Sequence, residues 1–388
     1  MADDIDLAFE QLADPDRPVH SVNLARLSDL SREHVLHFAN RWPMLPKERR
    51  LSFTRLLVEQ SESNIQYNFH AVFRSCLSDS DSEIRRLAIE GLWEDDRPAL
   101  ISLLAATLDN DPDGSVRAAA ASSLGRFVML GALGEMAEFH AARAEDALMA
   151  SWRRAHEPVE VRRRVLESLA CSMDAKVQDF IDIAYLDDDA LMRQSAVFAM
   201  GRSADRRWSG IVLQELRSPE PAMRYEAAVA AGELGIRAAV KPLVGLLDDP
   251  DEDMREAAAL ALGKIGGHDA RRALESATES GDGRLAEAAS EALEELAFNT
   301  DSPAELAHLS DAGDTVKLEA PLGYGDADTG DGFFSLDDRE DGLLADFGAD
   351  PFEDYVDDDQ SYGELGEEWD WTAGTGEEDE DPDDDDWD

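Results

Sequence analysis

A repeat of 31 residues constrains the fold of this chain more than any other feature. Segments 221–235 (PAMRYEAAVAAGELG) and 251–266 (DEDMREAAALALGKIG) are near copies, and Arg224 and Arg255 occupy the same place in each. An arginine opens an Ala-rich run or a related apolar run at four earlier places: Arg85, Arg117, Arg162 and Arg193. From Arg85 to Arg255, the six arginines are separated by 32, 45, 31, 31 and 31 residues. A fixed period of about 20–50 residues is typical of chains built from stacked repeats.

Each repeat is expected to fold as a pair of helices. In 238–266 the apolar residues from Met254 to Ile265 recur at the spacing of one helix face, and those from Val240 to Leu247 do the same. An Asp-Asp-Pro-Asp turn between them ends one helix and caps the next. One such pair cannot bury its apolar face, so pairs stack on their neighbours. The sequence therefore predicts an all-α solenoid of stacked antiparallel helix pairs.

Two further residue types recur at fixed distances from the repeated Arg, and we call each such set of equivalent positions a column of the 31-residue frame. Gly stands eight residues after the Arg in four units, where we expect neighbouring helices to approach closely. Asp stands six residues before it in four units, and Ser218 and His156 take that place in the other two. Fourteen extra residues, which the 45-residue gap implies, are most simply placed in 129–142.

Segments 111–125 and 248–266 resemble HEAT repeats, close to the short variety named after phycobiliprotein lyases. The resemblance implies a structural ladder, in which the loop Asp and the helix Arg bond within and between repeats. Carried over by position, the ladder comprises Asp79, Arg85, Asp111, Arg117, Asp187, Arg193, Arg224, Asp249 and Arg255. It is expected to lapse at Ser218 and His156.

We divide the chain into three parts. Residues 1–68 are N-terminal helices that form a divergent capping repeat, and residues 69–299 form the HEAT-like solenoid. Residues 300–388 are an acidic tail, in which 33 acidic and two basic residues follow position 300. Mutual repulsion and little burial predict that the tail is disordered. Its acidic segments with bulky side chains either bind a partner by folding on it or keep the chain soluble.

The net charge argues against nucleic acid as a partner, and one basic cluster has two possible interpretations. The chain carries a formal charge of −50, which repels nucleic acid. Its 31 Arg and five Lys fit either a high-salt cytoplasm or a GC-rich genome. One basic cluster stands out: Arg153, Arg154, Arg162, Arg163 and Arg164. It is either a solvated face or a contact patch for an acidic ligand, including the chain's own tail.

The sequence predicts a cytoplasmic protein without a membrane partner. The acidic N-terminus lacks the apolar segment of a signal peptide, and no apolar run approaches the ~20 residues of a membrane span. Cys76 and Cys171 are isolated, so neither a disulfide framework nor a zinc ribbon is indicated.

No catalytic residue, cofactor site or metal site is predicted. His34 and His37 lie three residues apart on one expected helix, but a third ligand is missing. HEAT-type deoxyhypusine hydroxylases bind iron through several His-Glu pairs, and only His156-Glu157 matches here. The iron–sulfur cysteines of HEAT-containing epoxyqueuosine reductases are missing, as are the GxxxxGK[ST] and GxSxG motifs.

Two functions remain. The first is a non-enzymatic scaffold that binds a protein partner on a concave, helix-lined surface, with the tail as an accessory or regulatory segment. The alternative is a bilin lyase or isomerase that acts on a phycobiliprotein-like partner. The alternative rests on the repeat likeness alone, and a fold does not imply a function.

Overall fold

The computed structural model describes Phe9 and residues 24–300. Between 24 and 300 it contains helices and no strand, which confirms the predicted all-α repeat fold. The tail after residue 300, predicted to be disordered, lies outside the described residues, as do residues 1–8 and 10–23 of the predicted N-terminal helices. All described residues belong to one compact unit.

The N-terminal helices open the array. A 3₁₀ turn, η1 (Ala25–Leu27), precedes α3 (Arg32–Arg41), a second 3₁₀ turn, η2 (Trp42–Met44), and α4 (Lys47–Ser63). Ser31 caps α3 by accepting from the His34 amide at 3.4 Å, as its side chain predicts. Contacts of α3 with α5 (His70–Cys76) and of α4 with α6 (Ser82–Glu90) join them to the first regular pair.

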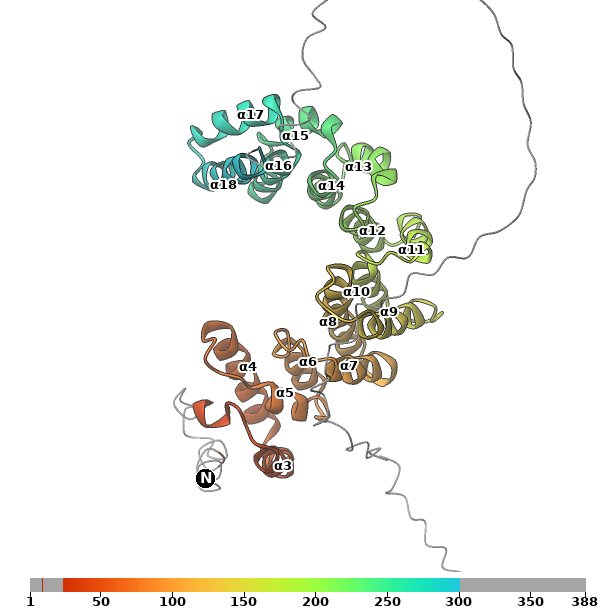
Figure 1. Ribbon diagram of the computed structural model, residues 1–388, viewed down its shortest axis with the longest axis vertical. Coiled ribbons are helices and arrows are strands. Elements are labelled where there is room, and N and C mark those ends of the chain that lie inside the picture. Colours follow the sequence, from red (N-terminus) through yellow and green to blue (C-terminus); the bar gives the residue numbers. More distant parts are fainter. Residues whose placement is uncertain (1–8, 10–23, 301–388) are drawn as a thin grey trace, which may run out of the picture. The chain divides into compact units, whose positions relative to one another are not determined.

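Six further pairs follow α5 and α6 in the described part (Figure 1). They are α7 (Ala99–Asn110) with α8 (Gly114–Ala132), α9 (Glu138–Trp152) with α10 (Val159–Leu169), α11 (Ala175–Tyr185) with α12 (Ala190–Arg202), α13 (Ser209–Glu215) with α14 (Pro221–Glu233), α15 (Val240–Leu246) with α16 (Glu252–Ile265), and α17 (His268–Thr278) with α18 (Gly283–Thr300). The 3₁₀ turns η3 (Arg206–Trp208) and η4 (Arg237–Ala239) precede α13 and α15.

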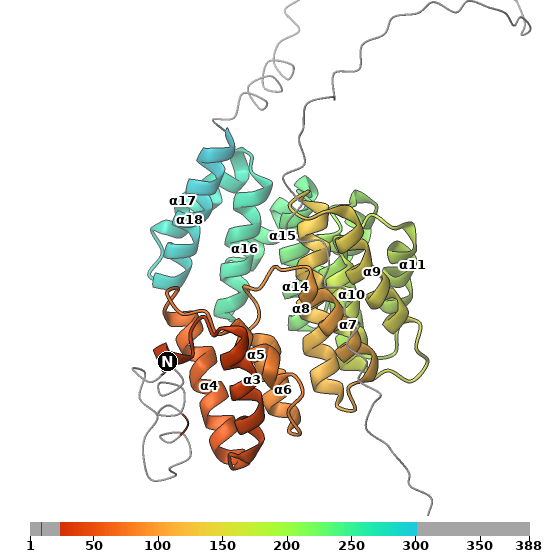
Figure 2. The same ribbon diagram turned by 60° about the horizontal axis from the view of Figure 1, so that its bottom comes forward.

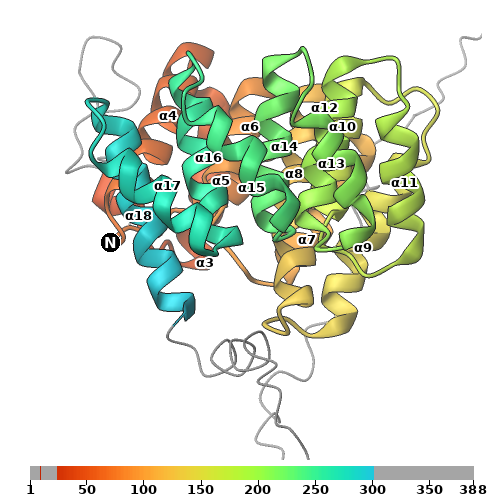
Figure 3. The same cartoon turned by 90° about the horizontal axis from the view of Figure 1, so that it is seen from above.

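The second helices of the pairs form one continuous layer. Each of α6, α8, α10, α12, α14 and α16 packs on the next second helix along the chain, up to α18. Figure 1 shows this order, and Figure 3 shows the same helices from above. We call this layer the second-helix row. The first helices, α5 to α17, pack on the second helix of their own pair.

Small residues set the spacing of the second-helix row. A Cβ placed on Gly263 would lie 2.7–2.9 Å from atoms of Ala292, including its backbone, in the next second helix. Gly125, Gly201 and Gly232 face the next second helix in the same way. The column of glycines therefore marks close helix approach, as the sequence predicts.

The 14 extra residues do not form an irregular segment. They lengthen α8 to 19 residues and α9 to 15, and only 133–137 connect the two helices. Gly131 allows the end of α8 to approach α9, because a Cβ there would lie 2.3 Å from that of Ala141. The inserted sequence is apolar and Ala-rich, so it extends the existing helices.

Candidate binding face

Most of the ladder arginines contact the following loop, and several of them join it to the loop before their own helix. Arg85 on α6 donates through Nη1 to the backbone carbonyl of Asp79 at 2.7 Å, in the loop just before its own helix. Its Nε and Nη2 donate to the two carboxylate oxygens of Asp111, in the next loop, at 2.7 and 2.8 Å. One guanidinium thus fixes the geometry within a repeat and between repeats.

The same arrangement recurs toward the C-terminus. Arg255 donates to the carbonyl of Asp249 at 2.7 Å and to Oδ2 of Asp282 from Nε at 2.8 Å. The nitrogen–oxygen distance is 3.6 Å between Arg224 and Asp249, and 3.3 Å between Arg162 and Asp187. The Arg–Asp pairs of the ladder therefore differ in nitrogen–oxygen distance.

The loop aspartates also begin the next helix. Oδ1 of Asp79 accepts from the amide of Asp81 at 2.9 Å, and Asp81 caps α6 by accepting from two amides of its first turn. Asp111, Asp187 and Asp249 accept from the residue two places on in the same way, at 2.9–3.0 Å. Each Asp orients a cap while its carboxylate faces the preceding repeat.

One of the two expected breaks is filled. Glu157, the residue after His156, accepts from Nε of Arg117 at 2.7 Å, so the expectation of a break at 156 is wrong. The carboxylate lies one position later than the frame predicts, directly before Pro158, which precedes α10. At Ser218 the break stays: Arg193 bonds the carbonyls of Asp187 and Asp188, and no carboxylate pairs with it among the described residues.

Besides Glu157, two further members of the ladder were missed in the sequence. Arg50 on α4 reaches Asp79 with Nε at 3.0 Å and Nη2 at 3.2 Å, and Trp42 donates to the same carboxylate at 2.7 Å. The frame was not extended to Arg50 because the gap to Arg85 is 35 residues. Asp282 was missed because the equivalent position in the 31-residue frame, six residues before Ala286, is Ser280. A search for any acidic residue within two positions of Ser280 would have included Asp282.

The structure does not bring the basic cluster together as a free surface. Arg154 pairs with Asp109, and Arg162 pairs with Asp187 while its guanidinium lies over the Trp152 ring. Arg163 and Arg164 both pair with Glu160 and Glu167 of their own helix. In the described part only Arg153 of the five has no carboxylate within ion-pair distance. Docking of the acidic tail there stays a prediction.

A pocket of about 320 Å³ opens on the second-helix row at α14, α16 and α18. Its apolar lining comes from Val229 on α14 and from Ala257, Leu260 and Ala261 on α16. Its polar lining comprises Tyr225, Asp253, Glu256, Lys264, Arg284, Glu291 and Glu295. Figure 2 shows α16 and α18, the two helices that contribute most of this lining, side by side.

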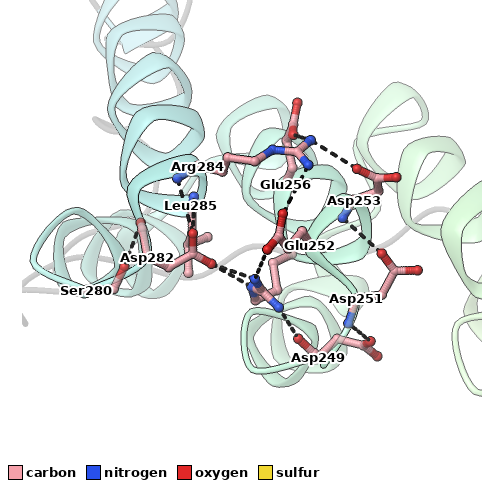
Figure 4. A network of polar contacts seen from close by, with 10 residues as sticks. Asp249, Asp251, Glu252, Asp253, Glu256, Ser280, Asp282, Arg284 and Leu285 are labelled. Carbon is pink, nitrogen blue, oxygen red and sulfur yellow. Dashed lines mark hydrogen bonds and ion pairs between the residues drawn. The ribbon is translucent and has the colours of Figure 1, made fainter.

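Part of the pocket's negative charge is already neutralised within the chain. Arg284 on α18 pairs with Asp253 at 3.0 Å and Glu256 at 2.5 Å on α16, and with Glu252 at 3.3 Å (Figure 4). Lys264 pairs with Glu233 on α14 at 2.5 Å. Glu291 and Glu295, by contrast, have no ion-pair partner among the described residues. The pocket thus offers two free carboxylates beside an apolar surface.

A half-buried carboxyl lies on the same row, outside the pocket. Burial, and next the charge of Glu167, raise the pKa of Glu226 on α14 to about 7, although Arg163 and Arg164 oppose the shift. This residue is one position from Tyr225, whose pKa burial also raises.

His156 is exposed and Glu157 is engaged by Arg117, so their pairing supplies no ligand set. Between 24 and 300, no group of three or more His, Cys, Asp or Glu side chains is placed to hold a metal ion. None of the helices there is both long and apolar enough to cross a membrane.

Comparison with known sequences agrees with the repeat geometry. A family model described as HEAT repeats matches residues 71–131 and 211–294. The chain contains HEAT repeats. The matches cover most of the pairs from α5 to α8 and from α13 to α18. The second region includes every residue that lines the pocket except Glu295. No curated protein matches the sequence.

Three solved structures are among those similar to this chain. Yeast importin-beta is 13% identical, with 79% of this chain and 47% of that chain covered and a TM-score of 0.48. Human deoxyhypusine hydroxylase is 17% identical, with 76% and 96% covered and a TM-score of 0.31. A designed armadillo repeat protein is 19% identical, with 50% and 99% covered and a TM-score of 0.33.

Proposed function

We propose that this protein is a non-enzymatic scaffold that binds a segment of a protein partner on its second-helix row, at α14, α16 and α18. The observation that supports the proposal is the pocket there, which combines an apolar lining with unpaired carboxylates. Pockets that hold small ligands span about 300–1,000 Å³. This one is at the lower end and open to a row of helices, which suits side chains of a bound segment better than a cofactor.

Glu157, the acid of the one His-Glu pair, is bonded by Arg117 in the ladder. Among the described residues, no pocket or contact favours the bilin lyase alternative. Cys76 and Cys171 are both free, so we also propose a reducing compartment such as the cytoplasm.

The experiment is site-specific photo-crosslinking of the full chain in its native cells. A benzophenone amino acid replaces Leu260 in the pocket or, as a matched control, Leu186 after α11, which is 80% exposed. We expect a discrete crosslinked partner from position 260 and none from position 186. Crosslinks that are missing from 260, or the same at both positions, would overturn the proposal.

A further inference from the structure

Two positions that line the pocket become glutamates in the last helix of the row. In the 31-residue frame, Leu260 and Lys264 of α16 correspond to Glu291 and Glu295 of α18. Glu287 precedes them by one turn, so three glutamates lie four residues apart along one stripe of α18. Like charges at this spacing disfavour a helix, and the described residues supply no cation to any of the three.

The chain's own arginine shows which contact the pocket favours. Arg284 places its guanidinium among three carboxylates of α16, on the same face. Val229 and Leu260 line the same pocket as Glu291 and Glu295. The other cation of the lining, Lys264, pairs with Glu233 instead of with either glutamate. Lys and Arg bury their hydrocarbon stems on apolar surfaces and leave the charged group in a polar environment.

We propose that the segment bound at this pocket presents a lysine or arginine, whose stem packs on Val229 and Leu260 and whose charge is paired by Glu291 and Glu295. The inference rests on the proposed function, since it assigns the chemistry of the partner at the same site. The partner is a basic peptide segment of another protein.

The negative charge of the pocket disfavours the other possible occupants. The chain's own tail carries 33 acidic and two basic residues, so it is repelled by the stripe. A second copy of this chain brings a formal charge of −50, and four of the five arginines in its densest basic cluster are already paired. A cationic segment reduces the repulsion along α18 and adds charge-assisted hydrogen bonds.

The test measures binding of a fluorescein-labelled Lys-Ser-Lys-Ser-Lys-Ser-Lys-Ser peptide to the full chain by anisotropy. Because the acidic tail attracts any cation, the decisive comparison is between two variants of equal charge. Glu291→Gln with Glu295→Gln removes the proposed site. Glu59→Gln with Glu62→Gln removes two exposed carboxylates of α4, which do not line the pocket.

At about 0.1 M salt, where charges are screened over about 10 Å, we expect the pocket variant to weaken binding and the α4 variant to leave it nearly unchanged. Loss of two charge-assisted bonds predicts a decrease of about tenfold or more. A peptide with norleucine at each lysine should bind weakly, and the pocket substitutions should not weaken it further. Equal effects of the two double variants would overturn the assignment of the cation.

The two proposals fail in different ways. If Leu260 crosslinks a partner but the pocket variant binds the lysine peptide like the control, the scaffold proposal stands and the cationic segment is excluded. If Leu260 captures nothing, the scaffold proposal fails whatever the peptide does.

Discussion

Arg117 of α8 donates to Glu157 across 40 residues, with 2.7 Å between Nε and Oε1. The side chain of Glu157 is 5% exposed and that of Arg117 is 15% exposed. This contact carries the ladder across the largest interruption of the repeat frame, where the sequence predicts a break. The contact between α8 and α10 is therefore held by a carboxylate that the 31-residue frame does not place.

Replacing Glu157 with Ala should destabilise the fold by about 3 kcal/mol, because it leaves a largely buried guanidinium without its partner. Urea unfolding of the full chain measures the change. His156→Ala is the matched control, since His156 is exposed, and should change stability by less than about 0.5 kcal/mol. Equal midpoints for the two variants would show that Glu157 faces solvent.

Arg255→Ala should cost more stability than Arg224→Ala. Arg255 reaches Asp282 from two nitrogens at 2.7 and 2.8 Å, whereas Arg224 lies 3.6 Å from Asp249. We expect a loss of about 2–3 kcal/mol for the first and about 1 kcal/mol for the second. Thermal or urea unfolding compares the two variants, with exposed Arg237→Ala as the control. A larger loss of stability for Arg224→Ala than for Arg255→Ala would contradict the relative strengths assigned to these two contacts.

Gly263→Ala should destabilise the contact of α16 with α18 by about 1–3 kcal/mol, because the new methyl group meets the backbone of Ala292. Gly245→Ala on α15 is the matched control, because a Cβ there has nothing within 4 Å. That change should instead stabilise the chain by about 0.5–1 kcal/mol, as Ala is the better helix former. Stabilisation by both changes would refute the close approach.

Glu226→Gln should stabilise the fold at alkaline pH and not at acid pH. The folded pKa is raised from 4.5 to about 7, so the folded chain binds this proton more tightly than the unfolded chain, and stability falls as pH rises through that interval. Discounted for partial exposure, the gain near pH 8 is about 1–2 kcal/mol, and it vanishes near pH 4.

Urea midpoints at the two pH values test this, with Glu62→Gln on α4 as the exposed control. A gain from Glu226→Gln that is the same at both pH values would show that the effect does not come from the titration of this carboxyl.

The sequence predicted those features that repeat in register. The Arg, Asp and Gly columns follow from helix period and close packing, so the pairs from α5 to α18 could be placed before their contacts were seen. Arg50, Glu157 and Asp282 escaped because a carboxylate or guanidinium can reach its partner from a neighbouring backbone position, and a strict frame does not allow for that.

The pocket was not predictable in the same way. The sequence shows that Glu291 and Glu295 of the last repeat stand at the positions of Leu260 and Lys264 in the repeat before it. Which acids remain unpaired depends on the carboxylates that Arg284 and Lys264 contact. Those contacts depend on the packing of three helices. The same limit explains the basic cluster at 153–164, where adjacent positions on the chain point to separate carboxylates.

The missing carboxylate at Ser218 has a consequence for how the array comes apart. Every other described second helix from α4 to α16 is fastened to the following loop by an arginine, but α12 is not, because Arg193 bonds only the carbonyls behind it. In a linear array, stability is a sum of repeat terms and nearest-neighbour terms, so the weakest junction sets where cooperativity ends. Under strain or partial denaturation the chain would divide after α12 into two blocks. The pocket lies wholly within the block that begins at α13, so separation of the two blocks would leave its lining together.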